Sequence, residues 1–236
     1  MTSPVVPETG EPTFRPATVA DVESLVDVME RTRAHYAGAK HRDVYRAVAK
    51  DSTGPRPKII TAVAECDGAV VGFVSAILSD SRRYWATLPV RHPAAAVAIL
   101  RHRMRKFRTR IDYRRRNRST YSSDEVLKPN VEVPPEVAER LSVRPPEHGS
   151  PRPGEHGAGI SLGLFMGIDP SMRGRRLGVR LFECLFAELR AAGAQRYDCS
   201  FSLYDPAAIR MHCNYPFTIY RLPGGYWGSL RLADLG

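Results

Sequence analysis

Residues 168–185 read IDPSMRGRRLGVRLFECL, in which the end of a strand is followed by a turn of glycines and cations and then by an apolar helical repeat. The strand is predicted to end at Ile168 because Asp169-Pro170 breaks it, and a helix is predicted from about Gly174 to Ala192. The core face of this helix is predicted to carry Leu177, Leu181, Cys184, Leu185 and Leu189. A short turn crowded with positive charge therefore joins the strand to the helix.

This cationic turn is predicted to bind an anion. The first N–H groups of a helix have no intrahelical partner and lie at the positive end of its dipole, so a pyrophosphate placed there meets several donors. Gly174 and Gly178 let the backbone approach closely, and Arg173, Arg175 and Arg176 add charge. The alternative is a helix whose first turn is merely basic. Because cations oppose the dipole at this end, three arginines without an anion would be unfavourable, and the phosphate site is the favoured interpretation.

The same turn resembles a signature of the GNAT (GCN5-related N-acetyltransferase) family, V/I-x-P-x-x-R-G-x-G-x-G/A, which lies between that family's fourth strand and third helix. Residues 168–178 follow it except at the middle glycine, where this chain has Arg176. Residues 205–217, DPAAIRMHCNYPF, align without gaps with the family's closing segment, N-P-A-A-I-R-L-Y-x-x-x-G-F. Residues 14–29, FRPATVADVESLVDVM, are similar to its first strand and helix. The segments occur in the family's order and leave residues 80–158 unaccounted for.

The resemblance implies a fold class and a co-substrate. The fold would be α/β (α+β), a GNAT fold with a mixed central sheet that is splayed after strand 4 and flanked by helices. The co-substrate would be acetyl-CoA or another acyl-CoA, with no metal, and its pantetheine arm would lie in the splay against the backbone of strand 4. The residues that the resemblance assigns to the cofactor are Met166, Gly167, Ile168, Arg173, Gly174, Arg175, Arg176, Leu177, Gly178 and Asp205.

The rest of the chain fits one domain with an insertion. Its 236 residues are long for one ordinary domain and short for two. We expect residues 1–12 to be a disordered tail and residues 13–236 a single GNAT domain, with a basic and Pro-rich insertion at about 80–158, between strands 3 and 4. In chain order the predicted elements are a helix capped by Thr18 with Asp21, a helix at 40–50, strands Ile59–Glu65 and Ala69–Leu78 joined by a hairpin at Asp67-Gly68, a helix at Ala94–Arg110, a mobile loop at 144–159, strands Ile160–Ile168 and Tyr197–Leu203, a short helix Asp205–His212, and strands Phe217–Leu222 and Gly228–Leu232.

Candidate catalytic residues follow from the resemblance and from acid–base chemistry. In many relatives the acid is a tyrosine in the closing helix, and this chain has His212 there. An imidazolium could protonate the departing thiolate or stabilise it by charge, whereas the alternative is that His212 only packs or bonds a carbonyl. Where some relatives place a glutamate base on strand 4, this chain has Gly163. Asp80 is the candidate replacement, directly or through water, with Glu155 and His156 as further candidates, and each of the three is otherwise an ordinary surface group.

Aromatic and basic side chains occupy the segments that would receive the acceptor. The candidate substrate residues are Tyr36, Tyr84 and Trp85, and the same segments carry His35, Arg82, Arg83, Tyr226 and Trp227. Aromatic faces beside arginines suit a sugar or a nucleotide, and packing in the core or rim is the alternative for each residue.

The predicted function is an acyl-CoA-dependent N-acyltransferase that moves acetyl to a primary amine of a small molecule, such as an amino sugar, a nucleotide-linked sugar or a secondary metabolite. Two alternatives remain open: an acetyltransferase of protein lysines or N-termini, and a catalytically inactive CoA-binding module with a basic interaction surface.

The net charge of +10 is concentrated in one run. Residues 101–118 hold ten Lys or Arg and one Asp, a local charge of +9, and the remaining sequence is nearly neutral. A solvated face is the commonest explanation of such a run, and a phosphate-bearing or acidic partner is the second. No recognised nucleic-acid motif accompanies the run, so nucleic acid is the least favoured partner.

Targeting and cysteine patterns complete the expectations. No stretch reaches the roughly 18–20 apolar residues that a membrane span requires, and residues 1–12 lack the basic and apolar regions of a signal peptide, so we expect a cytoplasmic protein. Cys66, Cys184, Cys199 and Cys213 share no C-x-x-C spacing and are predicted to be structural thiols. A homodimer is left open.

Overall fold

The computed structural model describes residues 10–32, 42–54, 57–78, 81–101, 135–138, 159–202, 206–222 and 225–235. In this part of the chain seven strands form one sheet in the order β1-β2-β3-β4-β5-β7-β6. Neighbouring strands are antiparallel except β4 and β5, which are parallel. The strands are β1 (Thr13–Pro16), β2 (Ile59–Cys66), β3 (Ala69–Leu78), β4 (Ile160–Ile168), β5 (Arg196–Ser202), β6 (Thr218–Leu222) and β7 (Gly225–Arg231). The predicted mixed sheet flanked by helices is confirmed.

The hairpin between β2 and β3 forms where the sequence predicts it. Asp67 and Gly68 have φ angles of 51° and 77°, the left-handed values that a tight two-residue hairpin turn requires at both positions. The turn places Cys66 opposite Ala69, and a one-residue register shift between Ala64 and Glu65 then places Val63 opposite Phe73.

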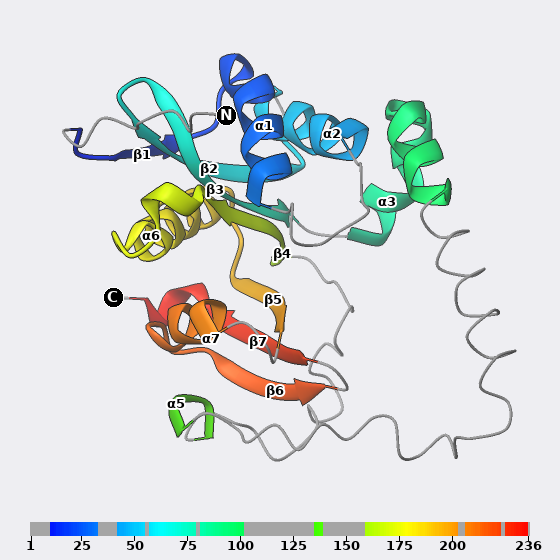
Figure 1. The fold of residues 1–236 in the computed structure, drawn as a ribbon. Helices are drawn as coiled ribbons and strands as arrows, with labels where there is room; N and C mark the ends of the chain where they lie inside the picture. Colours follow the sequence, from blue (N-terminus) through cyan, green and yellow to red (C-terminus); the bar gives the residue numbers. More distant parts are fainter. Residues whose placement is uncertain are drawn as a thin grey trace, which may run out of the picture.

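The helices are α1 (Val22–Thr32), α2 (Arg42–Thr53), α3 (Ser81–Arg91), α5 (Pro135–Ala138), α6 (Leu177–Ala191) and α7 (Pro206–Cys213), and residues 93–101 are also helical. Helices α1 and α2 cover one face of the β1–β4 part of the sheet, and α6 covers the other (Figure 1). Because residues 93–101 are helical, the helix predicted at Ala94–Arg110 is present as far as residue 101, and residues 102–110 lie outside the described residues. Helix α3 was missed, because Pro89 inside it breaks the sequence pattern of a helix.

Alternating residues of the central strands fill two separate cores. Val63 and Phe73 pack with α1 and α2, whereas Ala62 and Val74 pack with α6. On α6 the predicted leucines Leu177, Leu181, Leu185 and Leu189 are all buried. Cys184 is half-buried and packs against the same core. Phe182 and Phe186, which the prediction omitted, are buried beside the leucines.

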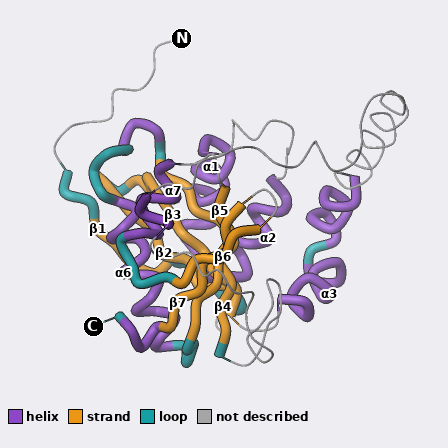
Figure 2. Tube along the Cα trace, turned by 90° about the horizontal axis from the view of Figure 1, so that it is seen from below, coloured by secondary structure: helices purple, strands orange, loops and turns teal. Residues whose placement is uncertain are grey.

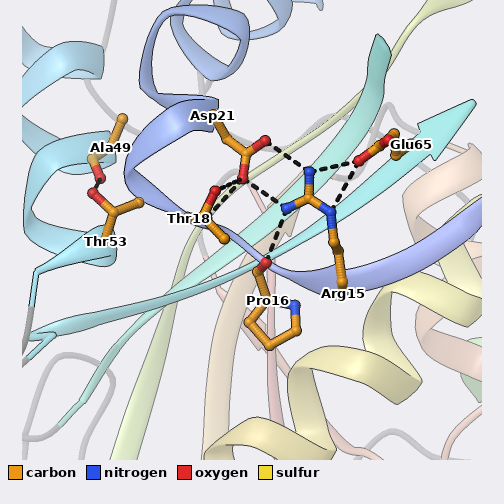
Figure 3. Close-up of polar contacts among 7 residues, drawn as sticks. All are labelled: Arg15, Pro16, Thr18, Asp21, Ala49, Thr53 and Glu65. Atoms are coloured by element: carbon orange, nitrogen blue, oxygen red, sulfur yellow. Dashed lines mark hydrogen bonds and ion pairs between the residues drawn. The ribbon is translucent and has the colours of Figure 1, made fainter. Parts of the chain in front are cut away.

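A charge cluster fixes the entry into α1 (Figure 3). The Arg15 guanidinium donates to both oxygens of Asp21, at 2.7 and 2.8 Å, and to Glu65 on β2 at 2.5 Å. The backbone N–H and the hydroxyl of Thr18 donate to the same Asp21 carboxylate, at 2.7 and 2.8 Å, which confirms the predicted cap. The hydrogen bonds from Arg15 lower the pKa of Asp21 from 3.8 to about 2. The cluster therefore stabilises the junction of β1, α1 and β2 as long as Asp21 is ionised.

Helix α3 lies beyond α2 and away from the sheet (Figure 2). Asp51 on α2 holds it: the carboxylate accepts from Arg91 at 2.5 Å and pairs with His92 Nε2 at 3.0 Å. The Arg91 guanidinium also lies over the Tyr84 ring, 4.8 Å from its centroid. Helix α3 is thus attached to the helical layer by a partly buried polar cluster, beside the apolar packing of Tyr84 and Leu88.

Candidate functional site

The sheet opens between β4 and β5. These strands pair only at Ile160–Leu162 with Arg196–Asp198, after which the partners separate. A cleft of about 760 Å³ occupies the gap and is lined by β4, the turn before α6, the first residues of α6, β5 and α7. The predicted splay after strand 4 is therefore present, and it exposes the β4 edge from Gly163 onward to the cleft.

A bulge reshapes β4 where the splay begins. Ser75 of β3 pairs with Phe165, whereas the next residue, Ala76, pairs with Gly163, so Leu164 is an extra residue on β4. Bulges redirect backbone groups and are frequent beside active sites. Sequence reasoning missed it, although a glycine inside a strand pattern, here Gly163, is its known signal.

The turn after β4 is anchored on both sides. The backbone N–H of Asp169 donates to Val71 O on β3 at 2.8 Å, and its carboxylate accepts from the N–H and hydroxyl of Ser171 at 3.1 and 2.7 Å. Arg31 of α1 bonds the other oxygen of Asp169 at 3.2 Å. Met172 in the following 3-10 turn is buried. The cationic residues that come next thus extend from a fixed base.

The helix after this turn begins later than predicted. Gly174 has φ of 83°, and Arg176 has φ of 56° with ψ of 20°, so neither residue can belong to a right-handed helix, and α6 starts at Leu177. Arg176 takes the left-handed conformation that costs a side-chain-bearing residue about 1–2 kcal/mol. The position at which this chain lacks the glycine of the GNAT signature is therefore one at which the backbone favours glycine.

Most of the predicted cofactor residues line the cleft. They are Met166, Gly167, Ile168, Arg173, Gly174, Arg176, Leu177 and Gly178. Arg175 is exposed and does not belong to the lining. At Gly178 an added Cβ would lie 3.0 Å from Met211 Sδ and 3.1 Å from Met166 Cε. The absence of a side chain there lets α6 approach β4 and α7 closely.

His212 on α7 also lines the cleft, within an aromatic cage. Its ring stacks on Phe201 at 4.2 Å and 12°, with Phe182 and Phe217 at 5.6 and 5.2 Å, and it is 6% exposed. Nδ1 lies 2.7 Å from Ala208 O. Because a carbonyl oxygen only accepts, Nδ1 carries a hydrogen, and only a protonated ring can also donate from Nε2.

Gly163, the position of the family's glutamate base, faces Tyr197 of β5. A Cβ at Gly163 would collide with the Tyr197 hydroxyl and touch Cys199 Cβ at 3.0 Å. The space that a glutamate side chain would enter is therefore filled by a tyrosine from the neighbouring strand. No feature of the linear sequence pointed to Tyr197, since the contact depends on the parallel register of β4 and β5.

The remaining predicted site residues lie elsewhere. Tyr84 is 3% exposed between α2 and α3 and does not line the cleft, and Tyr226 and Trp227 are buried in β7, so these three positions are explained by packing. Tyr36, Asp80, Asp205, Glu155 and His156 lie outside the described residues, as do residues 1–9, the run at 102–118 and the loop at 144–158. The backbone of Trp85 belongs to α3, and its side chain is not among those described.

Two further observations concern the chain as a whole. All four cysteines are free thiols, and burial raises the pKa of Cys199. Within the described ranges, no helix has the length and apolar character that crossing a membrane would take.

The fold is that of known acetyltransferases, although the sequence stands apart. No protein-family model and no curated protein matches the sequence. Among solved structures, 94% of this chain matches 99% of a GNAT-family acetyltransferase from Streptococcus pneumoniae, at 13% identity and a TM-score of 0.52. It matches 99% of the PaiA N-acetyltransferase of Thermoplasma acidophilum, solved with coenzyme A, at 8% identity and a TM-score of 0.51. It matches 94% of YncA from Salmonella typhimurium, solved with its cofactor acetyl-CoA, at 14% identity and a TM-score of 0.50. Each of these two matches covers 94% of this chain. The chain thus has the GNAT acetyltransferase fold.

Proposed function

We propose that this chain is a member of the GNAT family that uses an acyl-CoA, in the first place acetyl-CoA, to acylate a primary amine of a small molecule. The observation that carries the proposal is the cleft between β4 and β5, which runs from the end of their pairing at Leu162 to the cationic turn before α6. Solved structures of the same fold hold acetyl-CoA or coenzyme A.

The turn fits the phosphates of such a ligand. Arg173 and Arg176 line the cleft beside the first N–H groups of α6, so side-chain charge and backbone donors converge. At Gly174 a Cβ would meet nothing within 4 Å, so the backbone there is open to a ligand. Asp205, which the family resemblance also assigns to the cofactor, remains a prediction.

The exposed edge of β4 fits the pantetheine arm. Beyond Leu162, β5 no longer pairs with β4, so the β4 backbone at Met166, Gly167 and Ile168 faces the cleft instead of another strand. An extended chain with amide groups can add to such an edge as a further strand does. The thioester would then lie toward the closed end of the cleft, at Gly163 and the bulge.

His212 is our proposed acid for the departing thiolate. It lines the cleft, and the bond from Nδ1 to Ala208 fixes the ring so that Nε2 is the atom that can act. Acting as an acid requires the imidazolium, which stacking on Phe201 can stabilise as a cation–π pair. Packing alone is the competing role, and turnover by His212→Ala and His212→Tyr separates the two, since unchanged rates in both variants would remove His212 from the mechanism.

The base that removes a proton from the attacking amine stays a prediction. Gly163 supplies no carboxylate, and Asp80 lies outside the described residues. The lack of a carboxylate at Gly163 favours the second candidate function, a CoA-binding module without catalysis. An acceptor amine of low pKa would need little base, which counts against a protein lysine, whose reference pKa is about 10.4. The small-molecule amine stays our first choice over a protein lysine or N-terminus. A cytoplasmic location, a single domain and an acidic or phosphate-bearing partner at the basic run also stay predictions.

The test is release of free CoA from acetyl-CoA in the presence of a panel of amino sugars, polyamines and peptides. We expect thiol release with at least one small amine. Arg173→Ala should weaken acetyl-CoA binding about tenfold, whereas Arg175→Ala, which removes the same charge outside the cleft, should change it less than about threefold. Binding without turnover on any acceptor would favour the inactive module. Failure to bind both acetyl-CoA and CoA would refute the proposal.

A further inference from the structure

Tyr197 stands at the point where β4 and β5 part. It pairs with Ser161, and the pairing ends one residue later at Leu162. The side chain is 2% exposed, and its ring meets Phe186 and Phe182 edge-on at 5.3 and 5.8 Å. Because rings on one side confine it, the hydroxyl is held in a defined direction.

That direction is into the cleft. Tyr197 and Gly163 both line the cleft, and the hydroxyl lies against Gly163 so closely that a Cβ there would collide with it. No hydrogen bond of this hydroxyl is formed with the residues that the structure describes. Because the hydroxyl lies at the lining of the cleft, a ligand group placed there can accept its hydrogen bond.

The hydroxyl is suited to donating rather than accepting a proton. Burial raises the pKa of Tyr197 well above its usual range, so the side chain stays neutral at physiological pH and keeps its hydrogen. Gly163 is five residues before Ile168 on β4, a distance of about 16 Å along a strand. An extended pantetheine arm starting at the cationic turn therefore brings its thioester close to this hydroxyl.

We propose that the Tyr197 hydroxyl donates a hydrogen bond to the acyl carbonyl oxygen of the bound thioester. This inference rests on the proposed function and extends it, since it assigns recognition of the acyl group to a β5 side chain. Negative charge grows on that oxygen as the amine attacks, so the bond strengthens toward the transition state. Free CoA lacks the carbonyl and gains nothing from Tyr197.

The experiment compares Tyr197→Phe with Tyr215→Phe. Tyr215 is a matched control because it is also a buried tyrosine against Phe182 and Phe186, but its hydroxyl donates to Val179 O at 2.8 Å and it does not line the cleft. Calorimetric titration with acetyl-CoA and with CoA gives the affinity ratio, and thermal melting gives stability. We expect Tyr197→Phe to lower acetyl-CoA affinity about fivefold, to leave CoA affinity unchanged and to melt no lower than the wild type. Tyr215→Phe should melt lower and keep the wild-type ratio.

Two results would overturn the assignment. One is an unchanged ratio of acetyl-CoA to CoA affinity in Tyr197→Phe, whether both affinities stay the same or both fall equally. A lower melting temperature of Tyr197→Phe would show that the hydroxyl already has a partner in the free protein, which also contradicts it. If the wild type binds neither ligand, the proposed function itself is wrong; if the wild type binds both and the ratio is unmoved, only Tyr197 is wrongly assigned.

Discussion

Replacing Arg176 by glycine should stabilise the protein and weaken its binding of acyl-CoA at the same time. The left-handed backbone at Arg176 costs about 1–2 kcal/mol when a side chain is present, and glycine would relieve this cost. The greater freedom of glycine in the unfolded chain offsets about 0.5–1 kcal/mol of the relief. Arg176 makes no side-chain hydrogen bond as the N-cap of α6, so nothing else is lost on folding. The net gain should be about 0.5–1 kcal/mol.

In a domain of this size that gain corresponds to about 1–4 °C in melting temperature. Loss of one exposed phosphate-facing charge should weaken acetyl-CoA binding about fivefold. Scanning calorimetry measures the first effect and isothermal titration the second. Arg175→Ala is the control, because it removes the neighbouring charge where φ is not positive.

Arg176→Gly should melt above both the wild type and Arg175→Ala. If Arg176→Gly melts at or below the wild type, the backbone at this position stores no relievable strain. If it melts higher but binds acetyl-CoA as the wild type does, the arginine is not retained for the ligand.

Three further predictions concern stability. Asp21→Asn should lower the free energy of unfolding by about 2 kcal/mol at pH 7, because the pKa of Asp21 is about 2 in the folded chain instead of 3.8. This stabilisation is complete above about pH 4 and disappears as the pH falls through 2. Urea melts should therefore show a smaller difference between variant and wild type at about pH 2.5 than at pH 7, and an equal difference at both would contradict the role of ionised Asp21. Gly163→Ala should cost about 1–3 kcal/mol, and less in a Tyr197→Phe background, because the new methyl group collides with the Tyr197 hydroxyl; equal costs in both backgrounds would count against the geometry. His212→Ala should lower the free energy of unfolding by about 2–4 kcal/mol. His212→Phe should lower it by less, because phenylalanine keeps the stack on Phe201 and loses only the hydrogen bond to Ala208 O. The reverse order in denaturant melts would contradict the aromatic cage around His212.

Local signals account for the elements that sequence reasoning placed correctly. The Asp67-Gly68 hairpin, the Thr18–Asp21 cap and the strand ending at Ile168 each depend on residues close together in the chain. The turn residues that line the cleft were predicted for the same reason, since the turn is one continuous segment. Two features of this turn were predicted differently from the structure. Arg175 does not line the cleft, and α6 starts later than predicted, because residue type alone does not indicate a left-handed arginine.

Non-local pairing accounts for what was missed. The bulge at Leu164 appears only when β4 is set against β3, and the contact of Tyr197 with Gly163 appears only when β4 is set against β5. Tyr84 was predicted to contact a substrate, but the structure buries it against Arg91 of α3 and Asp51 of α2. The sequence does not show that these two helices pack together. The chemistry of the closed end of the cleft is therefore a product of strand register.

The short β4–β5 ladder has a consequence for the protein in the cell. Three residue pairs join the backbone of the β1–β4 half of the sheet to the β5–β7 half, and a ligand bonded along the open edge of β4 would lengthen that seam. The proposed acyl donor is thereby also a structural component, whose occupancy at one hundred times its dissociation constant would add about 2.7 kcal/mol to the free energy of unfolding. The lifetime of the folded chain would then follow the supply of its own co-substrate.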